Sequence, residues 1–124
     1  LNPPVQSSPY SAIASHNQGK FRDCITQSNS VLQWNPQHTR ADFFIGASYF
    51  RMAEAVKIPE SVTDSDYAKN SKERDRLLEM ARPHMEIYRK HNPEEARFWA
   101  PLLYEIYLYL NLGEEFKEIL KHLP

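Results

Sequence analysis

Residues 31–36 read Val-Leu-Gln-Trp-Asn-Pro, and residues 88–93 read Tyr-Arg-Lys-His-Asn-Pro. Each segment ends a helix-like run at Asn-Pro. Each is followed by an Ala-x-Phe-aromatic segment, at residues 41–44 and 96–99. Recurrence of a helix–stop–helix pattern is typical of stacked helical repeats. Such stacks usually bind other proteins and carry no chemistry of their own.

The apolar spacing around these segments predicts an all-α chain of six helices in three antiparallel pairs, with no strands. Residues 1–9 are expected to form a loose N-terminal segment, and residues 10–124 one helical domain. The first two helices are expected at residues 10–17 and 21–34. The third is expected to run from Thr39 to Pro59, and the fourth from a cap at Thr63 or Ser65 to Asn92. The last two are expected at residues 96–112 and 116–123. Pro83 is expected to kink its helix, and Pro101 to bend the next one.

Charge and hydropathy exclude two classes of partner. The formal net charge is −1, and basic residues alternate with acidic ones, so a general nucleic-acid binder is not expected. The longest apolar stretch, residues 98–110, contains Pro101 and Glu105. It is too short and too interrupted to span a bilayer, so membrane insertion is not expected. The chain begins with Leu1, which suggests a fragment or a processed form.

No catalytic, metal or cofactor site is expected from the sequence. His84 and His91 are seven residues apart and share a helix face, but a third ligand at suitable spacing is missing. Cys24 is the only cysteine and falls where a small buried residue is needed, so packing is favoured over a nucleophile. No phosphate loop, paired-acid site or Ser-His-Asp order is visible. We therefore do not expect an enzyme.

Several positions resemble the tetratricopeptide repeat family. The second half of that pattern matches Gly19, Phe21, Cys24, Val31 and Pro36, and resumes at Ala81, Tyr88 and Pro93; the first half matches Ile45, Gly46 and Tyr49; the final pair matches through Tyr104 or Tyr107 and Gly113. The chain departs from the pattern in its middle. Pro36 and Pro93 are 57 residues apart, whereas a standard repeat has about 34 residues.

The resemblance implies a right-handed α–α superhelix of about three antiparallel pairs, with close helix crossing at Gly46 and Ala81. The extra residues imply that 54–76 lengthen both helices of the middle pair, so that they project from the stack. The lengthened pair and the closing residues 103–107 also resemble repeat proteins of bacterial envelopes. The compartment is left open between the bacterial periplasm or envelope and the cytoplasm.

The resemblance further places a concave partner-binding groove on the first helix of the middle pair. Carried onto this sequence, the groove residues are Arg40, Phe43, Ala47, Phe50 and Arg51. Phe43 and Ala47 stand where some family members carry a Lys and Asn carboxylate clamp, so that clamp is not expected. An aromatic face with two arginines suits an apolar or acidic peptide. The alternative is that Phe43 and Phe50 pack against the neighbouring helix pair.

The predicted function is a protein–protein interaction scaffold, or the C-terminal end of a longer repeat protein, that binds a protein or peptide. The alternatives are a structural subdomain of a larger protein whose activity lies elsewhere, or an enzyme with an unrecognised site. A homo-oligomer is left open. The last helix is expected to cap the stack, with Phe116, Ile119, Leu120 and Leu123 inward and the charged residues around Glu118 facing water.

Overall fold

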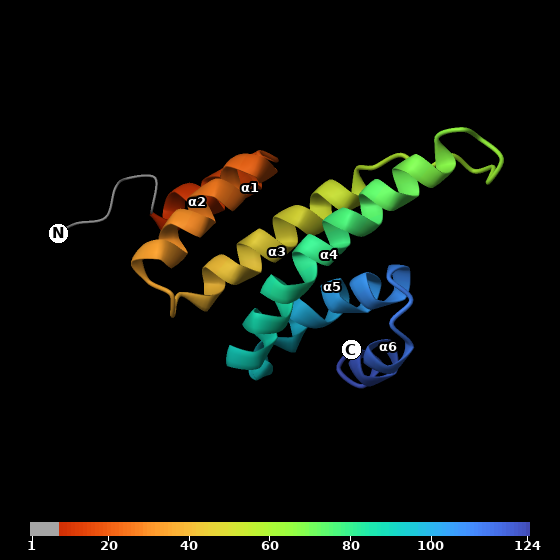
Figure 1. Cartoon of the computed structure of the whole chain (residues 1–124). Coiled ribbons are helices and arrows are strands. Elements are labelled where there is room, and N and C mark those ends of the chain that lie inside the picture. The colour runs from red at the N-terminus through yellow and green to blue at the C-terminus, as the bar shows by residue number, and fades with distance from the viewer. Residues whose placement is uncertain (1–7) are drawn as a thin grey trace.

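The computed structural model describes residues 8–124, and these form six α-helices with no strand among them (Figure 1). The elements in chain order are α1 (Pro9–Asn17), α2 (Phe21–Trp34), α3 (Thr39–Glu54), α4 (Tyr67–His91), the 3-10 turn η2 (Pro93–Glu95), α5 (Ala96–Tyr109) and α6 (Gly113–Leu120). The predicted all-α class is confirmed.

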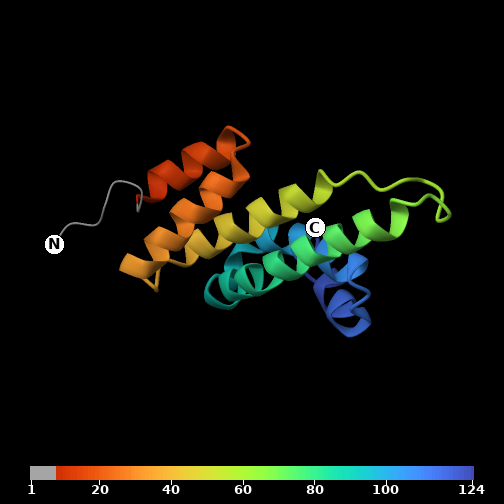
Figure 2. The same cartoon turned by 45° about the horizontal axis from the view of Figure 1, so that its top comes forward.

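Helix α3 lies at the centre of the arrangement. It packs against α4 along most of its length, against α1 and α2 on one side, and against the start of the C-terminal pair through α5. Figures 1 and 2 both show α1 and α2 on one side of the α3–α4 hairpin and α5 and α6 on the other. Each helix therefore buries its apolar face against its neighbours in the chain, as expected of stacked pairs.

One large apolar core joins α3, α4, α5 and α6. Leu78, Met85, Trp99, Leu103 and Ile119 are each at most 1% exposed. The indole N–H of Trp99 donates a 2.9 Å hydrogen bond to the backbone carbonyl of Asn92. This bond satisfies the one polar atom of a large buried ring and ties α5 to the turn that precedes it.

Only the second helix of the middle pair, α4, is lengthened. We expected residues 54–76 to extend both helices, but α3 ends at Glu54 and residues 55–66 form a loop. If the helix continued, the ring of Pro59 would press against the carbonyl of Ala55, and Pro59 could not donate a backbone hydrogen bond. The loop folds back instead, and Asn70 of α4 donates a 2.9 Å hydrogen bond to the carbonyl of Lys57.

Several predicted boundaries also move. Of the loose segment expected at residues 1–9, residues 1–7 lie outside the described part of the chain, and Pro9 is the first residue of α1. The Ser8 hydroxyl accepts a 3.2 Å hydrogen bond from the backbone N–H of Tyr10 and caps that helix. At the other end α5 stops at Tyr109. The turn that follows contains Asn111 with φ 61°, so α6 already begins at Gly113.

The cap helix is attached through a residue that we expected to face water. Glu118 accepts hydrogen bonds from the guanidinium of Arg89 in α4 and pairs with His122 at 2.8 Å. Burial raises the pKa of the Glu118 carboxyl, but the hydrogen bond and charge of Arg89 outweigh it and leave that pKa lowered. The Glu118 side chain is 42% exposed, so it meets water as expected, but its pairing with Arg89 was not expected. Arg89 lies 29 positions earlier, on a helix that only folding brings alongside.

Candidate functional site

Two of the five predicted groove residues, Arg40 and Phe43, line an open cavity of about 390 Å³ between the starts of α3 and α5. We call it the arginine pocket. Its lining residues come from α3, the end of α4 and the start of α5: Thr39, Arg40, Phe43, Phe44, Tyr88, Asn92, Glu95, Arg97 and Phe98. All five predicted groove residues lie on α3, so the residues from α4 and α5 were not predicted.

Aromatic rings form one wall of the arginine pocket. The Phe43 ring lies 5.0 Å from that of Tyr88 and 6.1 Å from that of Phe98, in tilted and edge-on geometries. Phe98 is 42% exposed. Phe98 follows Ala-x in the repeated segment, as Phe43 does, so the two phenylalanines occupy equivalent places on their helices. A half-buried Phe43 beside an exposed Phe98 forms a pre-arranged aromatic pair, which is a common anchor for a partner side chain.

The charge of the arginine pocket is positive. Arg40 is exposed, and the Arg97 side chain is 78% exposed and lies 4.7 Å over the ring of Phe98. The only carboxylate in the lining, Glu95, is 3.8 Å from Arg97. Burial raises the pKa of the Tyr88 hydroxyl and Glu95 adds to that rise, while Arg40 partly offsets it. Two guanidinium groups beside aromatic rings favour a carboxylate or an aromatic ligand group.

The other three predicted groove residues do not lie on this open surface. Ala47 and Phe50 are each 3% exposed and belong to the core between α3, α4 and α5. Arg51 is exposed, but it binds Glu54 at 2.7 Å and lies 5.5 Å from the Phe50 ring. The expectation of one continuous groove through all five residues was therefore wrong, because the middle of the α3 face is buried in the core that α3 shares with α4 and α5. For Phe50, packing against the neighbouring pair is the correct reading.

A second cavity, of about 280 Å³, opens where α3 and α5 end. We call it the glutamate pocket. It is lined by α3, the loop after it, α4 and α5, through Phe50, Ala53, Glu54, Val56, Ile58, Arg74, Leu78, Glu105 and Tyr109. Sequence reasoning missed it. The available signal was Glu105, a carboxylate that interrupts an otherwise apolar run.

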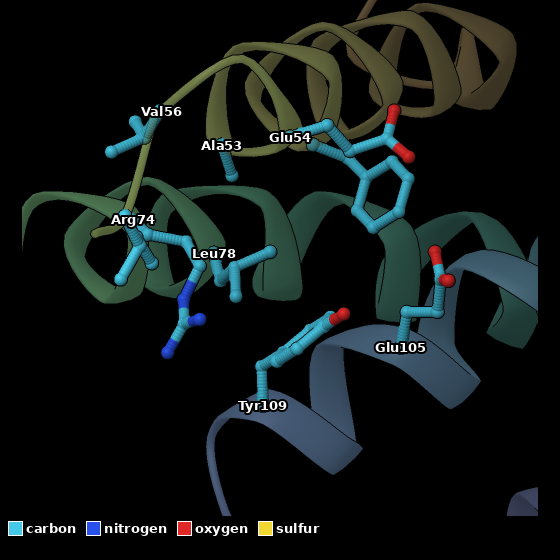
Figure 3. A pocket seen from close by; sticks show the side chains of 9 residues that line it. Ala53, Glu54, Val56, Arg74, Leu78, Glu105 and Tyr109 are labelled. Carbon is cyan, nitrogen blue, oxygen red and sulfur yellow. The ribbon is translucent and has the colours of Figure 1, made fainter. Parts of the chain in front are cut away.

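Charged groups in the glutamate pocket are separated in space. In Figure 3 the carboxylates of Glu54 and Glu105 lie on one side, and the Arg74 guanidinium points away from them on the other. Arg74 lies 4.8 Å over the Tyr109 ring and pairs with Asp75 at 3.1 Å. Within residues 8–124 the half-buried carboxylate of Glu105 has no hydrogen-bonding or ion-pair partner. The pocket therefore offers an unneutralised carboxylate above an apolar floor.

His84 and Cys24 have structural partners. The Nδ1 atom of His84 is 2.9 Å from a carboxylate oxygen of Asp42, which is 5% exposed, and this pair links α3 to α4. Cys24 is fully buried, with its sulfur 3.9 Å from the Ser28 hydroxyl. In the part of the chain that the structure describes, no three His, Cys, Asp or Glu side chains converge as metal ligands would.

Comparisons with family models, with curated proteins and with solved structures found no significant match for this chain. The resemblance to tetratricopeptide repeats therefore rests on the residues quoted above. Among the described helices, none has both the length and the apolar composition needed to cross a membrane.

Proposed function

We propose that this chain is a protein-interaction module that binds an extended segment of a partner protein along α3 and α5. We also propose that its three helix pairs form a right-handed superhelix of the tetratricopeptide type. The observation that carries the functional proposal is the arginine pocket, an open cavity in which exposed Phe98 and Arg40 stand beside an ordered aromatic cluster.

The packing of α3 supports the proposed superhelix. As the first helix of the middle pair, α3 contacts both helices of the preceding pair and the first helix of the following pair. This is the neighbour-to-neighbour pattern of a repeat stack. The close approach of α3 and α4 at Gly46 agrees with the place of the small residues in the tetratricopeptide pattern.

The composition of the pocket favours binding over a purely structural role. A buried core would have covered Phe98, and a solvated surface would not gather Phe43, Phe98 and two arginines at one place. Aromatic and arginine residues dominate interface energetics, because they bury large area and make directional contacts.

Selection from a random heptapeptide display library tests the proposal without knowledge of the natural partner. Binders selected on the wild-type chain should lose at least about tenfold in affinity against Arg40→Ala and against Phe98→Ala, since each variant removes a central contact. Ile87→Ala is the matched control, because Ile87 is 40% exposed on α4 and lines neither pocket.

Circular dichroism should show all three variants equally helical. The proposal fails if no binder is enriched, or if the binders are insensitive to Arg40→Ala and Phe98→Ala but sensitive to Ile87→Ala.

A further inference from the structure

The glutamate pocket indicates the chemistry of the partner, and this inference rests on the proposed function. We infer that the bound segment places a basic side chain, lysine or arginine, in the glutamate pocket and an acidic side chain at the arginine pocket. The two pockets lie at opposite ends of the same pair of helices, since α3 and α5 contribute their first residues to one and their last residues to the other.

Charge complementarity is the first argument. Glu54 and Glu105 bring two carboxylates to one side of the glutamate pocket (Figure 3). Glu105 has no partner within residues 8–124, and the pair between Glu54 and Arg51 is close to half exposed on both sides. An exposed pair of this kind contributes little. A cationic group that entered between the two carboxylates would therefore gain more than it displaced.

The protein's own arginine in this pocket does not neutralise these carboxylates. Arg74 is held by Asp75 and by the ring of Tyr109, and its guanidinium points away from Glu105. The hydroxyl end of Tyr109 is directed toward Glu105, so the carboxylate and the ring edge face the same space (Figure 3). A ligand cation can reach Glu105 without displacing Arg74.

The shape of the pocket is the second argument. Its floor is apolar, formed by Ala53, Val56 and Leu78. Lysine and arginine bury an aliphatic stem along apolar surface while the charged head stays with polar groups. A volume of about 280 Å³ that joins an apolar floor to an acidic rim suits this division of the side chain. A wholly apolar side chain would match the floor but leave the carboxylates unpaired, and a carboxylate would be repelled by them.

The distance along α5 sets the spacing of the two side chains. Arg97 in the arginine pocket and Glu105 in the glutamate pocket are eight residues apart, which is about 12 Å at the rise of an α-helix. An extended peptide covers about 3.3 Å per residue. The acidic and basic side chains of the partner should therefore be about four residues apart.

The test uses binders obtained from the heptapeptide library. Their sequences should be enriched in an acidic and a basic residue about four positions apart. For one synthetic binder, replacing its basic residue with norleucine should weaken binding to the wild-type chain about tenfold in fluorescence anisotropy, because a charge-assisted contact is lost. Glu105→Gln should weaken binding of the basic peptide by a similar factor and leave the affinity for the norleucine peptide unchanged.

The same binders distinguish the proposed function from the inference about the partner's charges. If they depend on Phe98 but show no basic residue, or if Glu105→Gln affects the basic and norleucine peptides equally, the inference is wrong and the interaction module stands. If binding to neither pocket is found, the proposed function and this inference fall together. Glu79→Gln is the matched control, because Glu79 is an exposed carboxylate on α4 and lines neither pocket.

Discussion

The carbonyl oxygen of Ala81 lies 3.2 Å from the point that a β-carbon on Gly46 would occupy. The Met85 side chain would lie 3.0 Å from the same point. The missing side chain at Gly46 therefore allows the backbones of α3 and α4 to approach each other. Their crossing holds the middle pair together and sets the direction of the α3 face that carries both pockets.

Filling this space should destabilise the fold. Gly46→Leu should lower the free energy of unfolding by about 1–3 kcal/mol in urea titration, because the added atoms overpack a close crossing. Gly113→Leu is the matched control, since a β-carbon there meets nothing within 4 Å. Equal stability of the two variants would show that the crossing tolerates a larger residue.

The buried carboxylate of Asp42 should depend on His84. His84→Ala removes the partner 2.9 Å away and should cost about 1–3 kcal/mol of unfolding free energy, the usual penalty for a buried polar group left unpaired. His91→Ala, on an exposed histidine of the same helix, should cost much less. In a double-mutant cycle with Asp42→Ala the losses should not add, because both single variants break the same contact. Additive losses would contradict the pairing.

Helix α6 should open more readily when Arg89 is lost. Arg89 pairs with Glu118 and also lies 4.6 Å over the ring of Trp99. Arg89→Ala should therefore speed hydrogen exchange across Gly113–Leu120 relative to α3, because local stability follows the contacts that hold an element. Arg97→Ala, at a side chain that is 78% exposed, should leave α6 exchange unchanged. Unchanged exchange in both variants would mean that apolar burial of Ile119 alone holds the cap.

Acid should weaken the N-terminal pair through His16. Burial, together with the charge of Arg51, lowers the pKa of His16 below 6.5, so the folded chain favours the neutral ring. The unfolded chain binds the proton more readily. The contribution of neutral His16 to the free energy of unfolding is therefore present above pH 6.5 and is lost as the pH falls through the lowered pKa.

The comparison of His16→Phe with wild type isolates this effect. The His16 ring packs 5.5 Å from Phe21 and 5.4 Å from Phe44, so phenylalanine keeps the aromatic packing without the titration. Between about pH 7.5 and about pH 5.5 the wild type should lose more thermal stability than His16→Phe. An equal loss in both proteins would assign the pH dependence to other groups.

Local features of the chain predicted the helices well. The positions of α2 and of the start of α3 follow from apolar spacing and from Asn35-Pro36, which act within a few residues. The end of α3 was harder to predict. Pro59 marked the stop, but the last helical residue is Glu54, because the loop gains burial of Val56 and a hydrogen bond from Asn70.

The candidate site shows where local prediction ends. By itself the sequence determined that Arg40, Phe43, Ala47 and Phe50 share one face of one helix, since helical periodicity places them there. It could not determine which of them are open, because that depends on how α4 and α5 pack against α3. In the folded chain Ala47 and Phe50 are buried in the core of α3, α4 and α5, and a pocket remains at each end of that face. Only the tertiary structure decides which residues of this face are buried, because burial depends on neighbours about fifty residues away in the chain, which no local pattern encodes.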